Sequence, residues 1–309
     1  MSIEKVSSIG PARIDIAYER LGDEARPPVL LIMGLGAQLI GWPDGFCAEL
    51  VARGLHVIRF DNRDAGESTH MADGPPPNMA AAMAGDTSSA SYTLSDMAGD
   101  SVGLLDALGI ASAHLVGASM GGCIAQTIAI EHPRRVRSLT SIMSTTGDPS
   151  VGRPHPDTAQ IFAGGTPTTR DEVIDRMLLA SRIVGSPGFP ADPDEVADRA
   201  GRSFDRSYDP LAAARQGIAV LASGDRTARL RRLAVPALVI HGTADKLWDG
   251  SGGQATAAAI PGAELLEIWG MGHDLPRALW SQIAARIAEL VERAESERHA
   301  RAAVSAAEA

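Results

Sequence analysis

Residues 114–122 read HLVGASMGG, which is a short apolar run, a serine between small residues, and the start of a helical pattern. The central residues 117–121 match the pattern G-x-S-x-G. In this pattern a strand turns directly into a helix, and only glycines leave room for so tight a turn. We therefore expect Ser119 to project above the edge of a sheet as a nucleophile. The alternative is that Ser119 is a small turn residue that caps the helix.

Short apolar runs bounded by glycine or proline recur on both sides of this turn. They predict buried strands at 28–33, 56–60, 114–117, 136–143 and 236–241. Helical spacing of apolar residues separates them, for example within 95–109 and within 120–132, where Pro133 ends the pattern. Strands that alternate with helices in this way favour a mainly parallel, doubly wound α/β sheet.

Two stretches break this alternation. Residues 69–91 are rich in proline, glycine, alanine and serine, which indicates a long connection. From about 147 to 226 strand patterns vanish, and glycine and proline clusters separate helical pieces. We interpret 147–226 as a helical cap insertion, and 1–146 together with 227–309 as the core. A loose surface excursion is the alternative for the insertion.

A serine hydroxyl is a weak nucleophile until a neighbouring base accepts its proton. Of the eight histidines, His273 has the most favourable position, in a glycine-rich loop after the apolar run 263–268. Such a loop past the end of a strand lines the active-site crevice of an α/β sheet. A solvated loop histidine is the alternative. His241 ends a predicted strand, and we expect it to order the loop that follows.

The imidazole in turn needs a carboxylate that orients it and stabilises its protonated form. Asp245 follows the predicted strand 236–241 through a short turn, and the chain between Asp245 and His273 is long enough for one helix and one strand. Asp249 is the rival, and a turn-capping role is the alternative for Asp245. The order serine, aspartate, histidine along the chain is the order expected of α/β-hydrolases.

A tetrahedral intermediate carries a negative oxygen that backbone N–H groups must stabilise. We expect one donor at Met120, directly after the nucleophile, and the other at Leu35, with Gly34 as the second choice. The glycines around Leu35 allow the backbone to approach a substrate closely.

Trp42 and Trp248 are candidates for lining the substrate pocket, and packing in the core or at its rim is the alternative.

The composition excludes several other classes of protein. A formal charge of -10 argues against nucleic-acid binding and against adsorption to an anionic membrane. Cys47 and Cys123 are too far apart in the sequence to suggest a disulfide framework or a zinc site. The stretch 61–66 (DNRDAG) is expected to form a charged turn rather than a metal site. Neither a signal peptide nor a membrane span is evident, so we expect a cytoplasmic protein.

Several of these segments resemble those of α/β-hydrolase esterases, with the aclacinomycin methylesterase subgroup as the nearest. The matching segments are 31–36, 41–46, 54–64, 117–122 and 270–273. The resemblance covers both halves of the core but not the insertion. It implies the α/β-hydrolase fold, catalytic roles for Ser119, Asp245 and His273, and oxyanion donors at Leu35 and Met120. It implies no particular substrate.

The expected reaction is hydrolysis of a small or medium carboxylic ester through an acyl-enzyme on Ser119, without metal or cofactor. The expected partner is therefore a small-molecule ester, while the oligomeric state is left open. Perhydrolysis of the haloperoxidase-like kind, acyl transfer, and lactone or amide hydrolysis are alternatives that use the same three residues. A hydrolase-fold protein that binds a ligand without catalysis is a further alternative.

Overall fold

The computed structural model describes residues 3–307, with side chains for residues 3–300, around one eight-stranded sheet. The strands follow the order β1-β2-β4-β3-β5-β6-β7-β8 across the sheet. Their bounds are β1 (Glu4–Ile9), β2 (Ile14–Leu21), β3 (Pro28–Ile32), β4 (His56–Phe60), β5 (Ala113–Ala118), β6 (Val136–Ile142), β7 (Ala237–Gly242) and β8 (Glu264–Ile268). Strands β3 to β8 are parallel, which confirms the expected mainly parallel sheet.

The sequence patterns do not predict the N-terminal hairpin of β1 and β2. These strands pair antiparallel with each other, and β2 pairs antiparallel with β4, with Tyr18 opposite Phe60. Strand β1 is largely exposed, and β2 reads IDIAYERL, so apolar and charged residues are mixed in both. The prediction selected uniformly apolar runs, which are typical of strands buried on both faces, and an edge hairpin lacks that signal.

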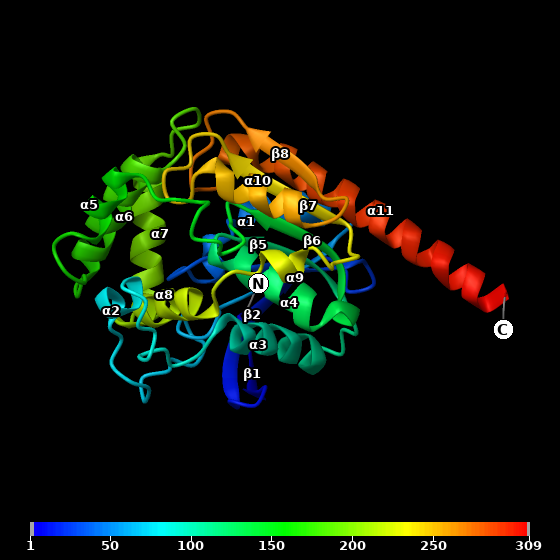
Figure 1. Ribbon diagram of the computed structural model, residues 1–309, viewed down its shortest axis with the longest axis horizontal. Helices are drawn as coiled ribbons and strands as arrows, with labels where there is room; N and C mark the ends of the chain where they lie inside the picture. Colours follow the sequence, from blue (N-terminus) through cyan, green and yellow to red (C-terminus); the bar gives the residue numbers. More distant parts are fainter. Residues whose placement is uncertain (1–2, 308–309) are drawn as a thin grey trace.

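Helices cover both faces of the sheet (Figure 1). On one face α1 (Asp44–Ala52) and α11 (Trp280–Ala307) pack against the strands through one hydrophobic core. On the other face α3 (Leu94–Ala107), α4 (Met120–Glu131) and the end of α10 (Gly250–Ala259) pack through a second core. With both faces covered, a substrate has access to the parallel sheet only at the ends of its strands.

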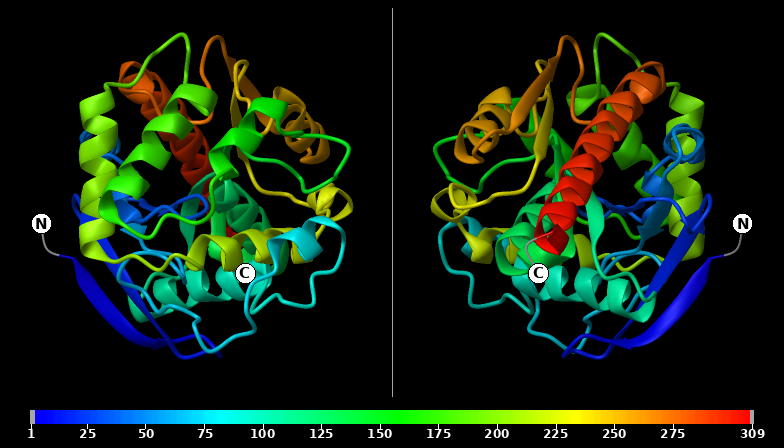
Figure 2. Two further views of the ribbon diagram at one scale, coloured as in Figure 1. Left: turned by 90° about the vertical axis from the view of Figure 1, so that its left-hand side faces the viewer. Right: turned by 90° about the vertical axis from the view of Figure 1, so that its right-hand side faces the viewer.

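Between β6 and β7 the chain forms helices and no strand, as the sequence indicates for 147–226. These helices are α5 (Ala159–Phe162), α6 (Arg170–Val184), α7 (Pro193–Arg206) and α8 (Ala212–Ser223), with α9 (Thr227–Leu230) just after them. Helices α5 to α7 lie together at one side of the molecule, with α8 below them (Figure 1; Figure 2, left). Helix α2 (Met79–Met83) lies within the long connection 69–91. The division into core and cap stays a prediction.

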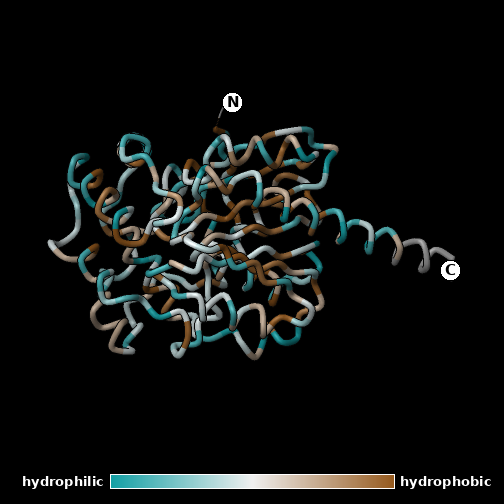
Figure 3. The backbone as a smooth tube through the Cα atoms, turned by 90° about the horizontal axis from the view of Figure 1, so that it is seen from above, coloured by the Kyte–Doolittle hydropathy of each residue, from teal (hydrophilic) through white to brown (hydrophobic). Residues whose placement is uncertain are grey.

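The most hydrophobic stretches of backbone run through the middle of the molecule (Figure 3). Among residues 3–307, no helix is both long enough and apolar enough to cross a membrane. The cytoplasmic location stays a prediction.

The backbone is closely packed where β5 turns into α4. A Cβ atom on Gly121 would overlap the carbonyl oxygen of Ile32 at the end of β3, and one on Gly117 would overlap the carbonyl oxygen of Gly121. Because the opposing atoms belong to the backbone, no rotation of a side chain could relieve the overlap. The two glycines therefore allow β3, β5 and α4 to converge around Ser119.

We expect Gly121→Ala to lower the free energy of unfolding by about 1–3 kcal/mol, since the new methyl group must displace the backbone of β3. Gly99→Ala is the matched control, because nothing lies within 4 Å of a Cβ atom at Gly99 in α3. Alanine also favours a helix over glycine by about 1 kcal/mol, so this control should be neutral or stabilising. Urea unfolding followed by circular dichroism measures both variants, and equal effects would contradict the packing argument.

Candidate active site

Ser119 lies between β5 and α4 with φ 56° and ψ −123°, a backbone conformation that residues with side chains rarely adopt. Its backbone N–H donates to the carbonyl of Ile142, at the end of β6, at 2.9 Å. The side chain makes no capping hydrogen bond to α4. The strained turn therefore points the hydroxyl away from the helix, and the capping alternative for the side chain does not hold.

His273 lies in the loop after β8 and contacts both other residues of the expected triad. Its Nε2 is 2.9 Å from Ser119 Oγ, and its Nδ1 is 2.7 Å from Asp245 Oδ2. An ionised carboxylate only accepts hydrogen bonds, so Nδ1 carries the proton and Nε2 is left to accept from the serine hydroxyl. The backbone N–H of His273 donates to the carbonyl of Val184, at the end of α6, at 2.6 Å. The insertion thus contacts the histidine loop directly.

Asp245 follows β7, and its side chain has no exposed surface. Its Oδ1 accepts from two backbone N–H groups of the following turn, at 2.8 and 3.0 Å, which leaves Oδ2 for His273. The rival Asp249 instead caps α10, where its Oδ1 accepts from the Ser251 N–H at 3.0 Å. Of the two aspartates considered from the sequence, only Asp245 contacts the imidazole.

A second imidazole approaches the same carboxylate. His241 Nε2 lies 2.8 Å from the carbonyl of Trp248 and 3.4 Å from Asp245 Oδ2. Burial alone would raise the pKa of Asp245, but the neighbouring His273 and His241 outweigh it and hold that pKa well below its usual range. Burial would lower the pKa of His241, but its contact with Asp245 outweighs burial and raises it. This contact is consistent with the loop-ordering role expected for His241.

The loop after β3 runs beside the serine. A Cβ atom on Gly34 would lie 3.0 Å from Ser119 Cβ and 3.5 Å from its Oγ. Within the described part of the chain, the backbone N–H groups of Gly34, Leu35 and Met120 have no hydrogen-bond acceptor. Met120 follows Ser119 in the chain, and Leu35 follows Gly34, which packs against Ser119. The N–H groups of all three expected oxyanion donors are therefore near the nucleophile and have no partner among the described residues.

The two tryptophans considered for the pocket lie in different surroundings. Trp42 is completely buried, and its ring stacks on Phe46 with centroids 5.6 Å apart. It belongs to the core beneath α1 and offers no surface to a substrate, so the core alternative holds for it. Trp248 is partly buried, and its ring forms a T-shaped pair with the His273 ring, with centroids 5.9 Å apart and an angle of 85° between the planes. Trp248 alone stays a candidate for substrate contact.

The stretch 61–66 joins the core to the insertion. The buried Asp61 carboxylate accepts from the backbone N–H of Leu39 at 2.6 Å and from Arg206, the last residue of α7, at 2.9 Å. Asp64 accepts two hydrogen bonds from Arg215 of α8, at 2.6 and 2.9 Å. The charged turn expected from the sequence is thus an anchor for α7 and α8, a role that the sequence patterns did not predict.

Asp64, His70 and Asp209 could hold a metal ion by distance, because their ligand atoms all lie within 4.8 Å of one another. The guanidinium of Arg215 bonds to both of these carboxylates. A fixed positive charge therefore already pairs with both carboxylates, which favours an ion-pair network over a metal site.

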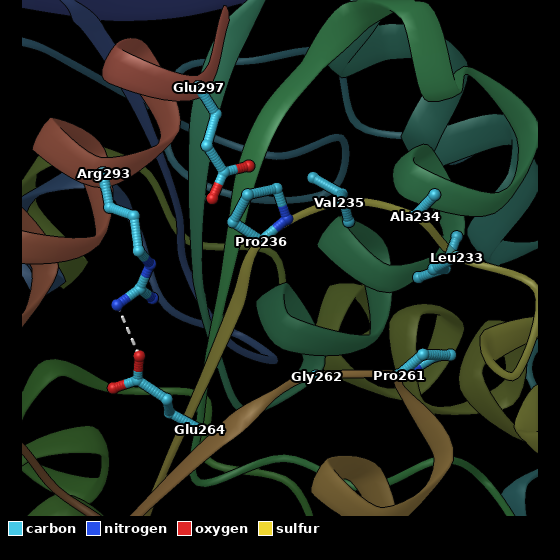
Figure 4. A pocket seen from close by; sticks show the side chains of 9 residues that line it. All are labelled: Leu233, Ala234, Val235, Pro236, Pro261, Gly262, Glu264, Arg293 and Glu297. Carbon is cyan, nitrogen blue, oxygen red and sulfur yellow. Dashed lines mark ion pairs between the residues drawn. The ribbon is translucent and has the colours of Figure 1, made fainter.

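A hollow of about 530 Å³ is separate from this site (Figure 4). Its lining includes Pro236, Glu264 and Arg293, the first two at the amino ends of β7 and β8. The triad residues follow the carboxyl ends of strands, which meet at the opposite edge of a parallel sheet. The hollow therefore does not serve Ser119.

A family model described as the alpha/beta hydrolase fold matches residues 27–276. The chain belongs to the alpha/beta hydrolase fold family. It is 31% identical to a rhodomycin D methylesterase of Streptomyces peucetius, in an alignment 294 positions long that covers 87% of this chain and 92% of that relative. It is 30% identical to a 2-hydroxymuconate semialdehyde hydrolase of Pseudomonas putida, in an alignment 280 positions long that covers 86% of this chain and 85% of the relative. The predicted resemblance to methylesterases is confirmed.

Solved structures of other alpha/beta hydrolases have the same fold. An esterase from Rhodococcus sp. ECU1013 has a TM-score of 0.71 at 22% identity, over 94% of this chain and 100% of that one. A thermophilic esterase from Thermogutta terrifontis has a TM-score of 0.69 at 22% identity, over 95% and 99% of the two chains. At such identities the likeness shows the fold alone.

Because the pKa of Asp245 is depressed in this alpha/beta hydrolase, its charged form stabilises the fold above the unfolded-state pKa of about 4. That contribution is lost as the pH falls through the lower folded-state value. We therefore expect Asp245→Asn to lower the free energy of unfolding at about pH 7, and the difference from the wild type to shrink below about pH 4. Urea unfolding of the wild type and the variant, at about pH 7 and below about pH 4, measures this difference in free energy. A difference that does not depend on pH would contradict this view of Asp245.

Proposed function

We propose that this protein is a serine carboxylesterase that works through an acyl-enzyme on Ser119. The observation that carries the proposal is the continuous line of contacts from Ser119 Oγ through His273 to Asp245, at 2.9 and 2.7 Å. It gives the hydroxyl a base, and gives the base an anion that stabilises its protonated form. Binding of a ligand without catalysis would not require this alignment.

In the proposed acylation, Ser119 Oγ attacks the ester carbonyl while its proton passes to His273 Nε2. The negative oxygen of the tetrahedral intermediate accepts hydrogen bonds from the N–H groups of Leu35 and Met120. Asp245 remains ionised and stabilises the imidazolium. His273 then gives its proton to the alcohol as the C–O bond breaks, which leaves the acyl group on Ser119.

Deacylation repeats these steps with water in place of the serine hydroxyl. His273 Nε2 accepts a proton from the water as it attacks the acyl-enzyme, and returns it to Ser119 Oγ as the acid leaves. No step of this scheme uses a metal or a cofactor.

The likeness to a rhodomycin D methylesterase supports a methyl ester as the first substrate class to test, beside small and medium esters. Trp248, whose ring forms a T-shaped pair with that of His273, is the side chain that we propose to contact the bound ester. Perhydrolysis, acyl transfer, and lactone or amide hydrolysis begin on the same kind of acyl-enzyme or tetrahedral intermediate, and the pocket decides among them. The ester is favoured because the methylesterase relative matches the chain over most of its length.

We expect the wild type to hydrolyse a p-nitrophenyl ester series with a maximum at one acyl length. Ser119→Ala should lower kcat/KM by at least about 10,000-fold, because no other nucleophile is aligned with the base. Ser144→Ala is a control for the loss of a serine hydroxyl, since Ser144 is buried and its hydroxyl faces Cys123 at 3.5 Å instead of the imidazole. Activity that survives in Ser119→Ala would refute the assigned nucleophile.

The two aspartates give a second matched pair in the same assay. Asp245→Asn removes the anion beside His273, so kcat should fall by about 10,000-fold, as expected when the imidazole loses its orienting carboxylate. Asp249→Asn removes the same charge only four residues away, and asparagine still caps a helix, so activity should stay near that of the wild type. If kcat falls in Asp249→Asn but not in Asp245→Asn, the carboxylate that orients His273 belongs to Asp249 and the assignment is wrong.

A further inference from the structure

Gln216 of α8 is completely buried and uses both ends of its side-chain amide. Its Oε1 accepts from the backbone N–H of Gly36 at 2.7 Å, and its Nε2 donates to the carbonyl of Arg63 at 2.8 Å. Because one end only accepts and the other only donates, these two partners fix the orientation of the amide. Helix α8 of the insertion is therefore hydrogen-bonded to the loop that carries Leu35.

This loop runs between α8 and the nucleophile. A Cβ atom on Gly36, which has φ 69°, would lie 3.4 Å from Ala213 Cβ, and one on Gly217 would lie 3.5 Å from Leu35 Cδ1. On its other side the loop passes Ser119, next to Gly34. A change in α8 at this point is therefore transmitted to the backbone beside the serine.

A second contact supports the same loop further along. The Gln38 Nε2 donates to the carbonyls of Ser203 and Ser207, at the end of α7, at 2.7 and 2.9 Å. Gly36 and Gln38 are thus both bonded to the insertion, whereas the N–H of Leu35 between Gly34 and Gly36 is left without an acceptor among the described residues.

We propose that Gln216 is a positioning residue for ester hydrolysis, which holds the oxyanion loop so that Leu35 N–H meets the developing charge. The proposal rests on the esterase function proposed above. Donors contribute most to catalysis when they are in place before the reaction, because no reorganisation is then needed in the transition state. By occupying Gly36 N–H, Gln216 also prevents that group from competing for the substrate oxygen.

Gln216→Met keeps the approximate shape of the side chain and removes both hydrogen bonds. We expect kcat to fall by about 10- to 100-fold, the scale of a misplaced catalytic group, with KM within about twofold of the wild type. A trifluoromethyl ketone, which forms a tetrahedral adduct with an active-site serine, should lose affinity by a similar factor. A loss in KM alone would assign Gln216 to substrate binding and overturn the proposal.

Gln126→Met is the matched control, because Gln126 is equally buried and bonds to Ser141 at 3.2 Å and to Arg226 at 3.1 Å, away from the oxyanion loop. It should leave both kcat and the affinity for the ketone near those of the wild type. Equal losses of kcat in the two methionine variants would show a general packing defect and overturn the proposal.

Amide hydrogen exchange tests the contact independently of activity. Loss of one hydrogen bond should speed exchange in the peptide that contains Gly36 by about tenfold in Gln216→Met, and not in Gln126→Met. If the wild type hydrolyses esters but exchange of the Gly36 peptide is unchanged in Gln216→Met, only the role of Gln216 is refuted and the esterase function stands. If exchange speeds up in Gln216→Met but the wild type hydrolyses no ester, the esterase function is refuted and, with it, the positioning role.

Discussion

The backbone contact between the start of α4 and the end of β3 is the constraint on which the site depends. Gly121 lies against the carbonyl of Ile32, and this approach leaves Ser119 in a left-handed conformation that points its hydroxyl out of the turn. The same contact brings the first N–H of α4, that of Met120, close to the residues that follow β3, Gly34 and Leu35. Any side chain at Gly121 would separate the two groups of donors.

The insertion between β6 and β7 contacts two of the segments that form the site, the histidine loop and the loop after β3. The carbonyl of Val184 accepts from the N–H of His273, so α6 holds the base, and Gln216 of α8 holds the loop that carries the proposed oxyanion donor. Each such hydrogen bond contributes only about 1 kcal/mol to stability, so their larger effect is on position. Buried ion pairs of Arg206 with Asp61 and of Arg215 with Asp64 attach the same helices to the core.

What the sequence could predict was local in the chain. A strand, a glycine-flanked serine and a helix are neighbours in sequence, so the turn at Ser119 and the parallel strands around it left a clear pattern. The edge hairpin of β1 and β2 left no uniformly apolar run, because apolar and charged residues are mixed in both strands. Trp42 could not be assigned to the core or the pocket from the sequence, because a tryptophan near a glycine-rich loop has the same sequence context in both. Gln216 meets Gly36 across 180 positions, and no local pattern reports such a contact.

The central claim is that one strained, base-activated serine provides the chemistry, and covalent labelling tests it most directly. A fluorophosphonate reacts with a serine only where a base and oxyanion donors activate it, so the folded protein should acquire one phosphonyl group. Peptide mass spectrometry should place that group on Ser119. Labelling of a different serine, or none in a folded protein, would contradict the account.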